Sequence, residues 1–344
     1  MAQSQNPMSW HAAPRSQVTA RLAKGQLPHA LLIGGERGVG KRRFADDLAH
    51  VLVCEQPLGE DAVPCGRCKQ CELIAADTHP DVRHYAPEKS RMIKIDQIRA
   101  LSAFAVASPQ VAQRKIIIVD RADQLNINSA NALLKTLEEP TADVVLLLLQ
   151  ETGRPVLPTL RSRCQSLIIA TPGVETASEW LAGELDQEGT KITATADDRR
   201  QALEMARFAP RLALEYLTGD YLALRREALD VFRRFMKSEV SVSQAARPFK
   251  ALGAETTLWL MEVWASDLAR IQAGAEGRDR EAADMLGFLA GVNPPWRAHE
   301  LLDAVREGRS ALVYNANPEL EAERLLLQWQ GLMPVRRRRP SQAH

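Results

Sequence analysis

Residues 30–42 have the sequence ALLIGGERGVGKR, and this stretch decides the fold of the chain. Its apolar start, residues 30–33, predicts a buried strand. Four residues then follow at the spacing G-x-x-x-x-G-K: Gly35, Gly38, Gly40 and Lys41. Between a strand and a helix, such glycines let backbone N–H groups surround a phosphate, and the lysine reaches its outer oxygens. The stretch therefore predicts a phosphate-binding loop, with an ordinary glycine-rich turn as the alternative.

Two positions of this phosphate site differ from those of an ATP-hydrolysing enzyme. Arg42 stands where the motif has a Ser or Thr, whose hydroxyl holds Mg²⁺ in a way that a guanidinium cannot. After the apolar run 116–119, Asp120 fills the first acidic position, but Arg121 replaces the Glu that would polarise the attacking water. Since phosphoryl transfer depends on positioning and charge stabilisation, we expect a site able to bind ATP but not to hydrolyse it. Asp120 as a simple cap of the next turn is the alternative.

Apolar runs alternate with helical patterns through the first half of the chain. Strands are predicted at residues 30–33, 81–85, 115–120, 144–149 and 166–169, and helices at 44–53, 95–105 and 130–137. This alternation predicts an α/β fold with a parallel sheet covered by helices. Near residues 171–173 the pattern changes to short helices, and from residue 222 to longer ones, so the second half is expected to be helical.

The composition excludes few functions, but it limits the partners and the cellular compartment that the sequence predicts. The chain has 344 residues, 45% of them hydrophobic, and a formal net charge of +1, so any contact with nucleic acid must be local. The apolar run 144–149 is too short to span a bilayer, and the first residues show no apolar signal segment. These features predict a cytoplasmic protein without a membrane partner.

Four of the five cysteines cluster at the spacing C-x₁₀-C-x₂-C-x₂-C, at Cys54, Cys65, Cys68 and Cys71. Four thiolates suit a tetrahedral Zn²⁺ ion, which would be structural because it leaves no open coordination position. An iron–sulfur cluster and redox-active thiols are the alternatives. The fifth cysteine, Cys164, is expected to be a small buried residue.

Three segments resemble the AAA+ clamp-loader family: HPDVRHYAPEKS at 79–90, NALLKTLEEP at 131–140 and LRSRC at 160–164. The resemblance is strong over residues 25–170 and continues to the C-terminus by helix pattern only. It implies a RecA-like AAA+ domain at 1–170 with a zinc module at 54–71. A helical lid at 171–221 and a helical collar at 222–334 would follow. The remaining residues, 335–344, form a basic tail with four arginines at 336–339, expected to be solvated and disordered.

The resemblance also implies a function. The family's complexes are pentamers that open a ring-shaped sliding clamp and load it onto primed DNA. A member with a broken phosphate site would be a rigid subunit without activity of its own, in a DNA-directed DNA polymerase holoenzyme, a nucleotidyltransferase. Its partners would be the motor subunits and delta, and, through the complex, the clamp and DNA.

Two arginines receive roles through this resemblance. Arg163 lies in a Ser-Arg-Cys triplet typical of the family, and it is expected to act in trans on ATP bound to a neighbouring motor subunit. Arg161 would share a face with Arg163 if the segment were extended, and a surface charge pair is the alternative. Arg211 stands in the lid where related ATPases keep an arginine that senses nucleotide.

Two other functions remain in competition with this one. An active ATP-hydrolysing motor subunit is disfavoured by Arg42 and Arg121. A zinc-bearing DNA-binding module is disfavoured by the near-neutral net charge and by the lack of a dense basic stripe in the sequence.

Overall fold

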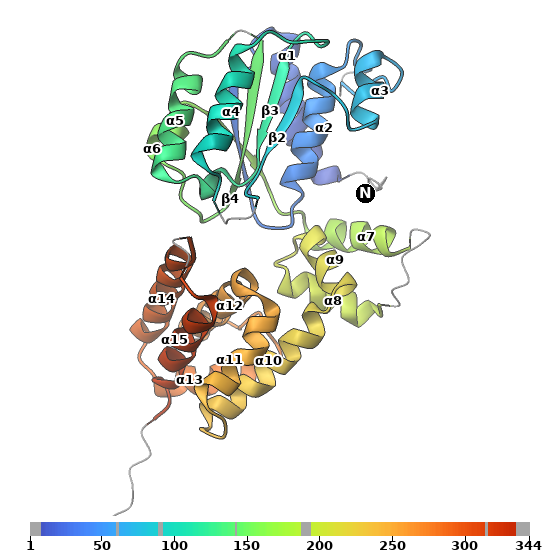
Figure 1. Ribbon diagram of the computed structural model, residues 1–344. Helices are drawn as coiled ribbons and strands as arrows, with labels where there is room; N and C mark the ends of the chain where they lie inside the picture. Colours follow the sequence, from blue (N-terminus) through green and yellow to red (C-terminus); the bar gives the residue numbers. More distant parts are fainter. Residues whose placement is uncertain are drawn as a thin grey trace, which may run out of the picture. The chain divides into compact units, whose positions relative to one another are not determined.

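The computed structural model describes residues 8–59, 62–88, 92–141, 143–186, 194–313 and 316–334 (Figure 1). The chain forms two compact units. The first extends to residue 193 and includes residues 206–214, and the second comprises residues 194–205 and the chain from residue 215 onward. The basic tail predicted at 335–344 lies outside the described residues.

A five-stranded sheet forms the centre of the first unit. In the order β2-β3-β4-β1-β5, the strands are Val82–Tyr85, Lys115–Val119, Val144–Glu151, Ala30–Gly35 and Gln165–Ile169. All neighbouring strands are paired in parallel. Every residue of β1 and β3 is buried, as expected for strands covered on both faces. The predicted α/β fold with a parallel sheet is confirmed, with each strand close to its predicted position.

Helices cover both faces of this sheet (Figure 1). The helices of the sheet region are α1 (Ala12–Ala23), α2 (Lys41–Val53), α3 (Lys69–Ala75), α4 (Ile95–Val106), α5 (Ile127–Glu138) and α6 (Pro158–Arg161). Side chains alternate between the two faces of each strand, and Leu32, Ile117 and Leu146 share one apolar cluster with α4 and α5. Helix α2 packs against β1, β3 and β4. This arrangement places the carboxyl ends of the central strands beside the N-terminus of α2.

Three helices follow the sheet: α7 (Val174–Leu185), α8 (Ala196–Met205) and α9 (Pro210–Thr218). Trp180 of α7 packs edge-on against Trp10, with ring centroids 5.7 Å apart. The two compact units divide this region, because α7 belongs to the first unit and α8 to the second. The separate lid at 171–221 and the boundaries around it therefore stay predictions.

The second unit is helical, as the sequence predicted. Its longer helices are α10 (Tyr221–Met236), α11 (Val242–Leu252), α12 (Ala254–Gln272), α13 (Ala283–Val292), α14 (Trp296–Val313) and α15 (Pro318–Gln330). Phe232 of α10 stacks on Trp264 of α12, and Trp329 of α15 meets the Phe232 ring edge-on. Helix α15 begins with the side chain of Asn317 accepting a hydrogen bond from Glu319 N and with Pro318 in the first turn. Within the described residues, no helix has both the length and the apolar character needed to cross a membrane.

Candidate nucleotide, metal and arginine sites

The predicted phosphate loop connects β1 to α2, in the strand–turn–helix context that the motif requires. Gly38 and Gly40 adopt φ values of +86° and +87°, which residues other than glycine rarely adopt. A Cβ atom at Gly38 would also lie 2.4 Å from the Cβ of Leu212, so only glycine fits there. The loop is therefore closely covered by the start of α9.

The N-terminal segment covers the loop from a second direction. Trp10 Nε1 and His11 Nε2 both donate to Val39 O, at 2.9 Å each. Since a carbonyl oxygen only accepts, His11 carries its proton on Nε2 in this arrangement. Burial lowers the pKa of His11 from its ordinary 6.5 to about 4, so the ring is neutral near pH 7. Neither aromatic residue was singled out from the sequence, because no pattern in the chain links them to a loop 28 residues away.

The functional groups of the loop bind to the protein itself. Lys41 Nζ donates to Gly35 O and Glu36 O, both at 2.8 Å, and burial lowers the pKa of this ammonium group. Arg211 N donates to Gly38 O at 3.1 Å, while the Arg211 side chain is exposed. The nucleotide-sensing role of Arg211 stays a prediction.

The metal position of the phosphate site contains an ion pair. Arg42 Nη1 lies 3.4 Å from Asp120 Oδ2, and Arg42 Nε lies 3.2 Å from Asp46 Oδ1. Asp120, which would help to hold Mg²⁺ in an active ATPase, is therefore paired with a guanidinium of its own chain. The Arg42 and Asp120 side chains are 41% and 30% exposed, so the pair is partly screened by water.

A second charged group, missed by sequence reasoning, lies at the same edge of the sheet. The Asp123 side chain is fully buried and lies 3.7 Å from Arg121 Nε and 3.8 Å from Arg154 Nη1. Burial raises the pKa of Asp123, although both arginines oppose that shift. Asp123 Oδ1 also accepts a hydrogen bond from Glu151 N at the end of β4. Arg121, at the position of the water-activating Glu, thus contributes to a structural ion-pair network.

The four predicted zinc ligands come together. Cys54 ends α2, Cys65 and Cys68 lie in the following loop, and Cys71 lies in α3. Their sulfur atoms all lie within 4.8 Å of one another, and that of Cys71 lies 3.5, 3.7 and 3.9 Å from those of Cys68, Cys54 and Cys65. Tetrahedral Zn–S bonds of about 2.3 Å imply S–S distances of about 3.8 Å. The spacing therefore fits one tetrahedral metal ion better than a cluster whose own atoms would separate the thiolates.

Buried polar residues attach this cysteine module to the sheet. Gln70 Nε2 donates to Val111 O at 2.8 Å, and its Oε1 lies 2.8 Å from His79 Nε2. His79 Nδ1 accepts from Asp81 N, so His79 Nε2 is the donor to Gln70. Burial favours the neutral form of Asp81, but hydrogen bonds from three backbone N–H groups, those of residues 110–112, outweigh it and lower its pKa.

Arg163 lies after a helical turn, not in an extended segment. Pro158 begins the short helix α6, which ends at Arg161, and Ser162 continues with helical dihedral angles. The segment is not extended, so the condition under which Arg161 and Arg163 would share a face is not met. Arg163 Nη2 lies 2.5 Å from Glu138 Oε1, and Nη1 donates to Thr159 O at 3.0 Å.

Cys164 is only partly buried, and it packs against the apolar cluster of the sheet. Burial raises the pKa of its thiol to about 11, so it is protonated near neutral pH. It is a packing residue, as expected, though less enclosed than the sequence suggested.

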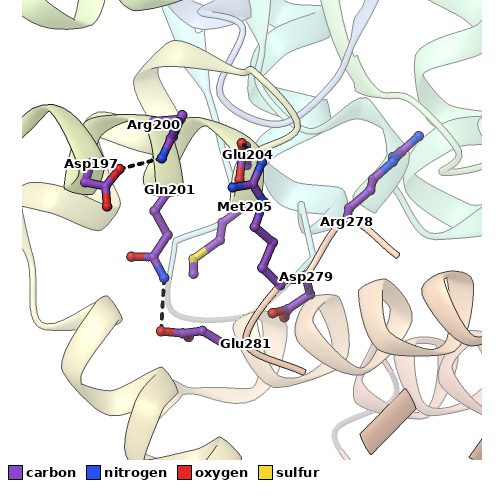
Figure 2. A pocket seen from close by; sticks show the side chains of 9 residues that line it. Asp197, Arg200, Gln201, Glu204, Met205, Arg278, Asp279 and Glu281 are labelled. Atoms are coloured by element: carbon purple, nitrogen blue, oxygen red, sulfur yellow. Dashed lines mark hydrogen bonds and ion pairs between the residues drawn. The ribbon is translucent and has the colours of Figure 1, made fainter. Parts of the chain in front are cut away.

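A cavity of about 220 Å³ lies in the helical unit, and none of the residues predicted to be functional lines it (Figure 2). Figure 2 shows Gln201 of α8 pointing at Glu281, and these side chains form a hydrogen bond of 3.0 Å. Arg280 pairs with Glu204 at 3.1 Å. Beneath them the buried Arg225 binds both Asp279 and Glu281. Because these charges are satisfied by one another, the cavity is a polar contact between α8 and the loop before α13.

The parallel sheet with strand order β2-β3-β4-β1-β5 and the phosphate loop between β1 and α2 define a RecA-like AAA+ fold, to which the chain adds a four-cysteine module. A family profile described as "DNA polymerase III, delta subunit" matches residues 11–172. The delta′ subunit of DNA polymerase III from Pseudomonas aeruginosa is 31% identical over 330 residues, covering 94% of this chain and 97% of that protein. The chain belongs to the DNA polymerase III delta′ subunit family.

Other relatives extend the comparison. The delta′ subunit of Escherichia coli K12 is 30% identical over 321 residues, covering 92% of this chain and 93% of the relative. The gamma/tau subunit of Mycobacterium bovis is 31% identical over 175 residues, covering 51% of this chain and 30% of that protein. About half of this chain therefore resembles a second kind of DNA polymerase III subunit.

Proposed function

We propose that this chain is a clamp-loader subunit that hydrolyses no ATP itself and completes the ATP site of a neighbouring motor subunit with Arg163. The Arg42–Asp120 ion pair is the observation that carries the proposal. A hydrolysing site needs a metal-binding hydroxyl and a free acidic group at these positions. Here a fixed positive charge replaces the first and neutralises the second.

The surrounding residues support the same conclusion. Arg121, at the position of the water-activating carboxylate, lies beside the buried Asp123. Lys41 binds two carbonyl oxygens of its own loop, so a triphosphate would compete with Gly35 and Glu36 for its ammonium group. ATP binding without turnover is compatible with the retained glycines and Lys41, and is part of the proposal.

Arg163 has the chemistry and the exposure that a contribution in trans requires. Its side chain is 35% exposed, so part of the guanidinium is accessible to a partner. A guanidinium is always charged and stabilises the negative charge that spreads over the oxygens of a transferred phosphoryl group. In switch GTPases an arginine supplied by a partner is worth about 10³- to 10⁵-fold in rate.

The partners follow from the family and from this role. As a member of the delta′ family, the chain would assemble with motor subunits and delta. The sliding clamp and primed DNA would be contacted through that complex. The four cysteines would hold one structural Zn²⁺, which would supply folding free energy and no catalytic chemistry.

The test is the ATPase activity of a complex reconstituted with this chain. We expect Arg163→Ala to leave folding and assembly intact and to lower DNA- and clamp-stimulated hydrolysis in part, because other motor sites keep their own arginines. Arg161→Ala is the control, since it removes an exposed arginine two positions away. Equal effects of the two substitutions, or unchanged ATPase after Arg163→Ala, would contradict the role in trans.

Assays of the isolated chain test the competing functions. Magnesium-dependent hydrolysis by the isolated chain, lost in Lys41→Ala, would identify a motor subunit. Tight, salt-dependent DNA binding by the isolated chain would identify a DNA-binding module.

A further inference from the structure

The guanidinium of Arg163 is held by groups from two helices. Glu138 Oε1, at the C-terminal end of α5, lies 2.5 Å from Nη2. Thr159 O, in α6, accepts from Nη1 at 3.0 Å, and Ser162 Oγ lies 3.4 Å from the same nitrogen. An exposed arginine side chain is usually free to sample many rotamers, so three contacts on one guanidinium fix its direction.

The two holding groups are themselves fixed by the core. Leu137 precedes Glu138 and is 2% exposed, and Leu160 follows Thr159 and is 1% exposed. Both leucines belong to the same apolar cluster beneath α5 and α6, and the two helices contact each other. The carboxylate and the carbonyl therefore have defined positions, although Glu138 itself is 47% exposed on its side chain.

The hydrogen-bond inventory of the guanidinium leaves room for a ligand. A guanidinium has five N–H groups. Nη1 donates to Thr159 O and Ser162 Oγ, and Nη2 forms an ion pair with Glu138. Among the described residues no hydrogen bond or ion pair involves Nε, and Nε and Nη2 lie on the same side of the planar group, where arginine binds the two oxygens of a phosphate.

We propose that Glu138 is a positioning residue for Arg163, orienting its guanidinium for a phosphate bound on the neighbouring subunit. This inference rests on the proposed function, because it assumes that Arg163 acts in trans. Glu138 itself does not touch the nucleotide. Glu138 orders the long Arg163 side chain before the phosphate binds, so that less conformational entropy is lost on binding.

The experiment measures steady-state ATPase of the reconstituted complex, stimulated by clamp and primed DNA, as a function of ATP concentration. We expect Glu138→Ala to lower the Arg163-dependent part of kcat roughly three- to tenfold, with the KM for ATP nearly unchanged. Glu138→Gln should keep part of the activity, since its amide oxygen still accepts from Nη2. Glu139→Ala removes a neighbouring exposed carboxylate and is the matched control.

The double variant separates positioning from a merely structural effect. If Glu138 acts through Arg163, Glu138→Ala causes no further loss when Arg163 is already alanine. Equal activities of Glu138→Ala and Glu139→Ala, alongside a clear loss in Arg163→Ala, would overturn the inference and leave the proposed function standing. A rise in ATPase with Glu138→Ala would also overturn it, because the carboxylate would then restrain the arginine. No loss in Arg163→Ala would remove the proposed function together with the inference.

Discussion

The phosphate loop and the cysteine module are both defined by residue spacing, yet they differ in how their functional groups are satisfied. At the loop, Lys41 binds carbonyl oxygens and Arg42 faces Asp120, so groups of opposite character from the same chain meet each other. At the module, four groups of one kind converge within 4.8 Å. The polar groups of the first site are thus paired within the chain, whereas the thiols of the second have the arrangement of a metal site.

This difference shows what a retained motif can and cannot establish. The glycines of the loop keep its shape, because Gly38 and Gly40 have left-handed dihedral angles and close neighbours. Shape alone does not give hydrolysis, which depends on the side chains at residues 42 and 121. In the cysteine module, the residues that define the sequence pattern are themselves the candidate metal ligands, so the pattern predicts both the local structure and its chemistry.

Removing the metal should produce the largest effect. Cys68→Ser, or a strong chelator, should unfold the segment between α2 and β2, because metal binding supplies about 10–16 kcal/mol of folding free energy in zinc-finger peptides. Elemental analysis should find one zinc per chain in the native protein, and limited proteolysis should cleave the segment only after metal loss. Cys164→Ser, which alters the one cysteine outside the cluster, should keep the zinc. Iron with visible absorbance, or metal-free protein with an intact module, would contradict this account.

Acid should lower the free energy of unfolding through His11, which packs over the phosphate loop, by a smaller amount than loss of the metal. The pKa of His11 is about 4 in the folded chain and 6.5 ordinarily, so only the unfolded chain binds a proton between these values. The stability from neutral His11 is complete above pH 6.5 and falls as the pH drops toward 4, by about 2–3 kcal/mol.

The check is urea unfolding at several pH values with His11→Gln as the comparison. The glutamine amide can donate to Val39 O without titrating, so the difference between the two proteins isolates the histidine. Parallel pH profiles for both proteins would mean that His11 is protonated in the folded chain or does not hold the loop.

The smallest effect on stability is expected for the Arg42–Asp120 ion pair. Arg42→Ser restores the hydroxyl of the motif and removes a partly exposed pair, which should change stability by less than about 1 kcal/mol. It should not create ATP turnover, because Arg121 still occupies the second position. Hydrolysis by the single variant would show that residue 121 matters less than the account requires.

Periodicity and spacing predicted the elements that depend on local sequence. The apolar runs at 115–120 and 144–149 became β3 and β4, and the helical pattern at 44–53 became most of α2. The four cysteines came together, since Cys54 follows the end of one helix and the other three lie at or near the start of the next, at short spacing.

What sequence could not predict depends on contacts between distant segments. Trp10 and His11 cover the loop through the carbonyl of Val39, and Gln70 joins the cysteine module to Val111. Neither pairing has a signal in one sequence, because buried polar bonds can be made by many residue types. The helical turn before Arg163 had a signal in the sequence, since Pro158 favours the first turn of a helix.

The decisive measurement is ATP hydrolysis by the isolated, zinc-loaded chain in the presence of Mg²⁺. We expect no turnover above that of Lys41→Ala, because Arg42 neutralises Asp120 and Arg121 replaces the water-activating carboxylate. Magnesium-dependent hydrolysis that disappears in Lys41→Ala would contradict it.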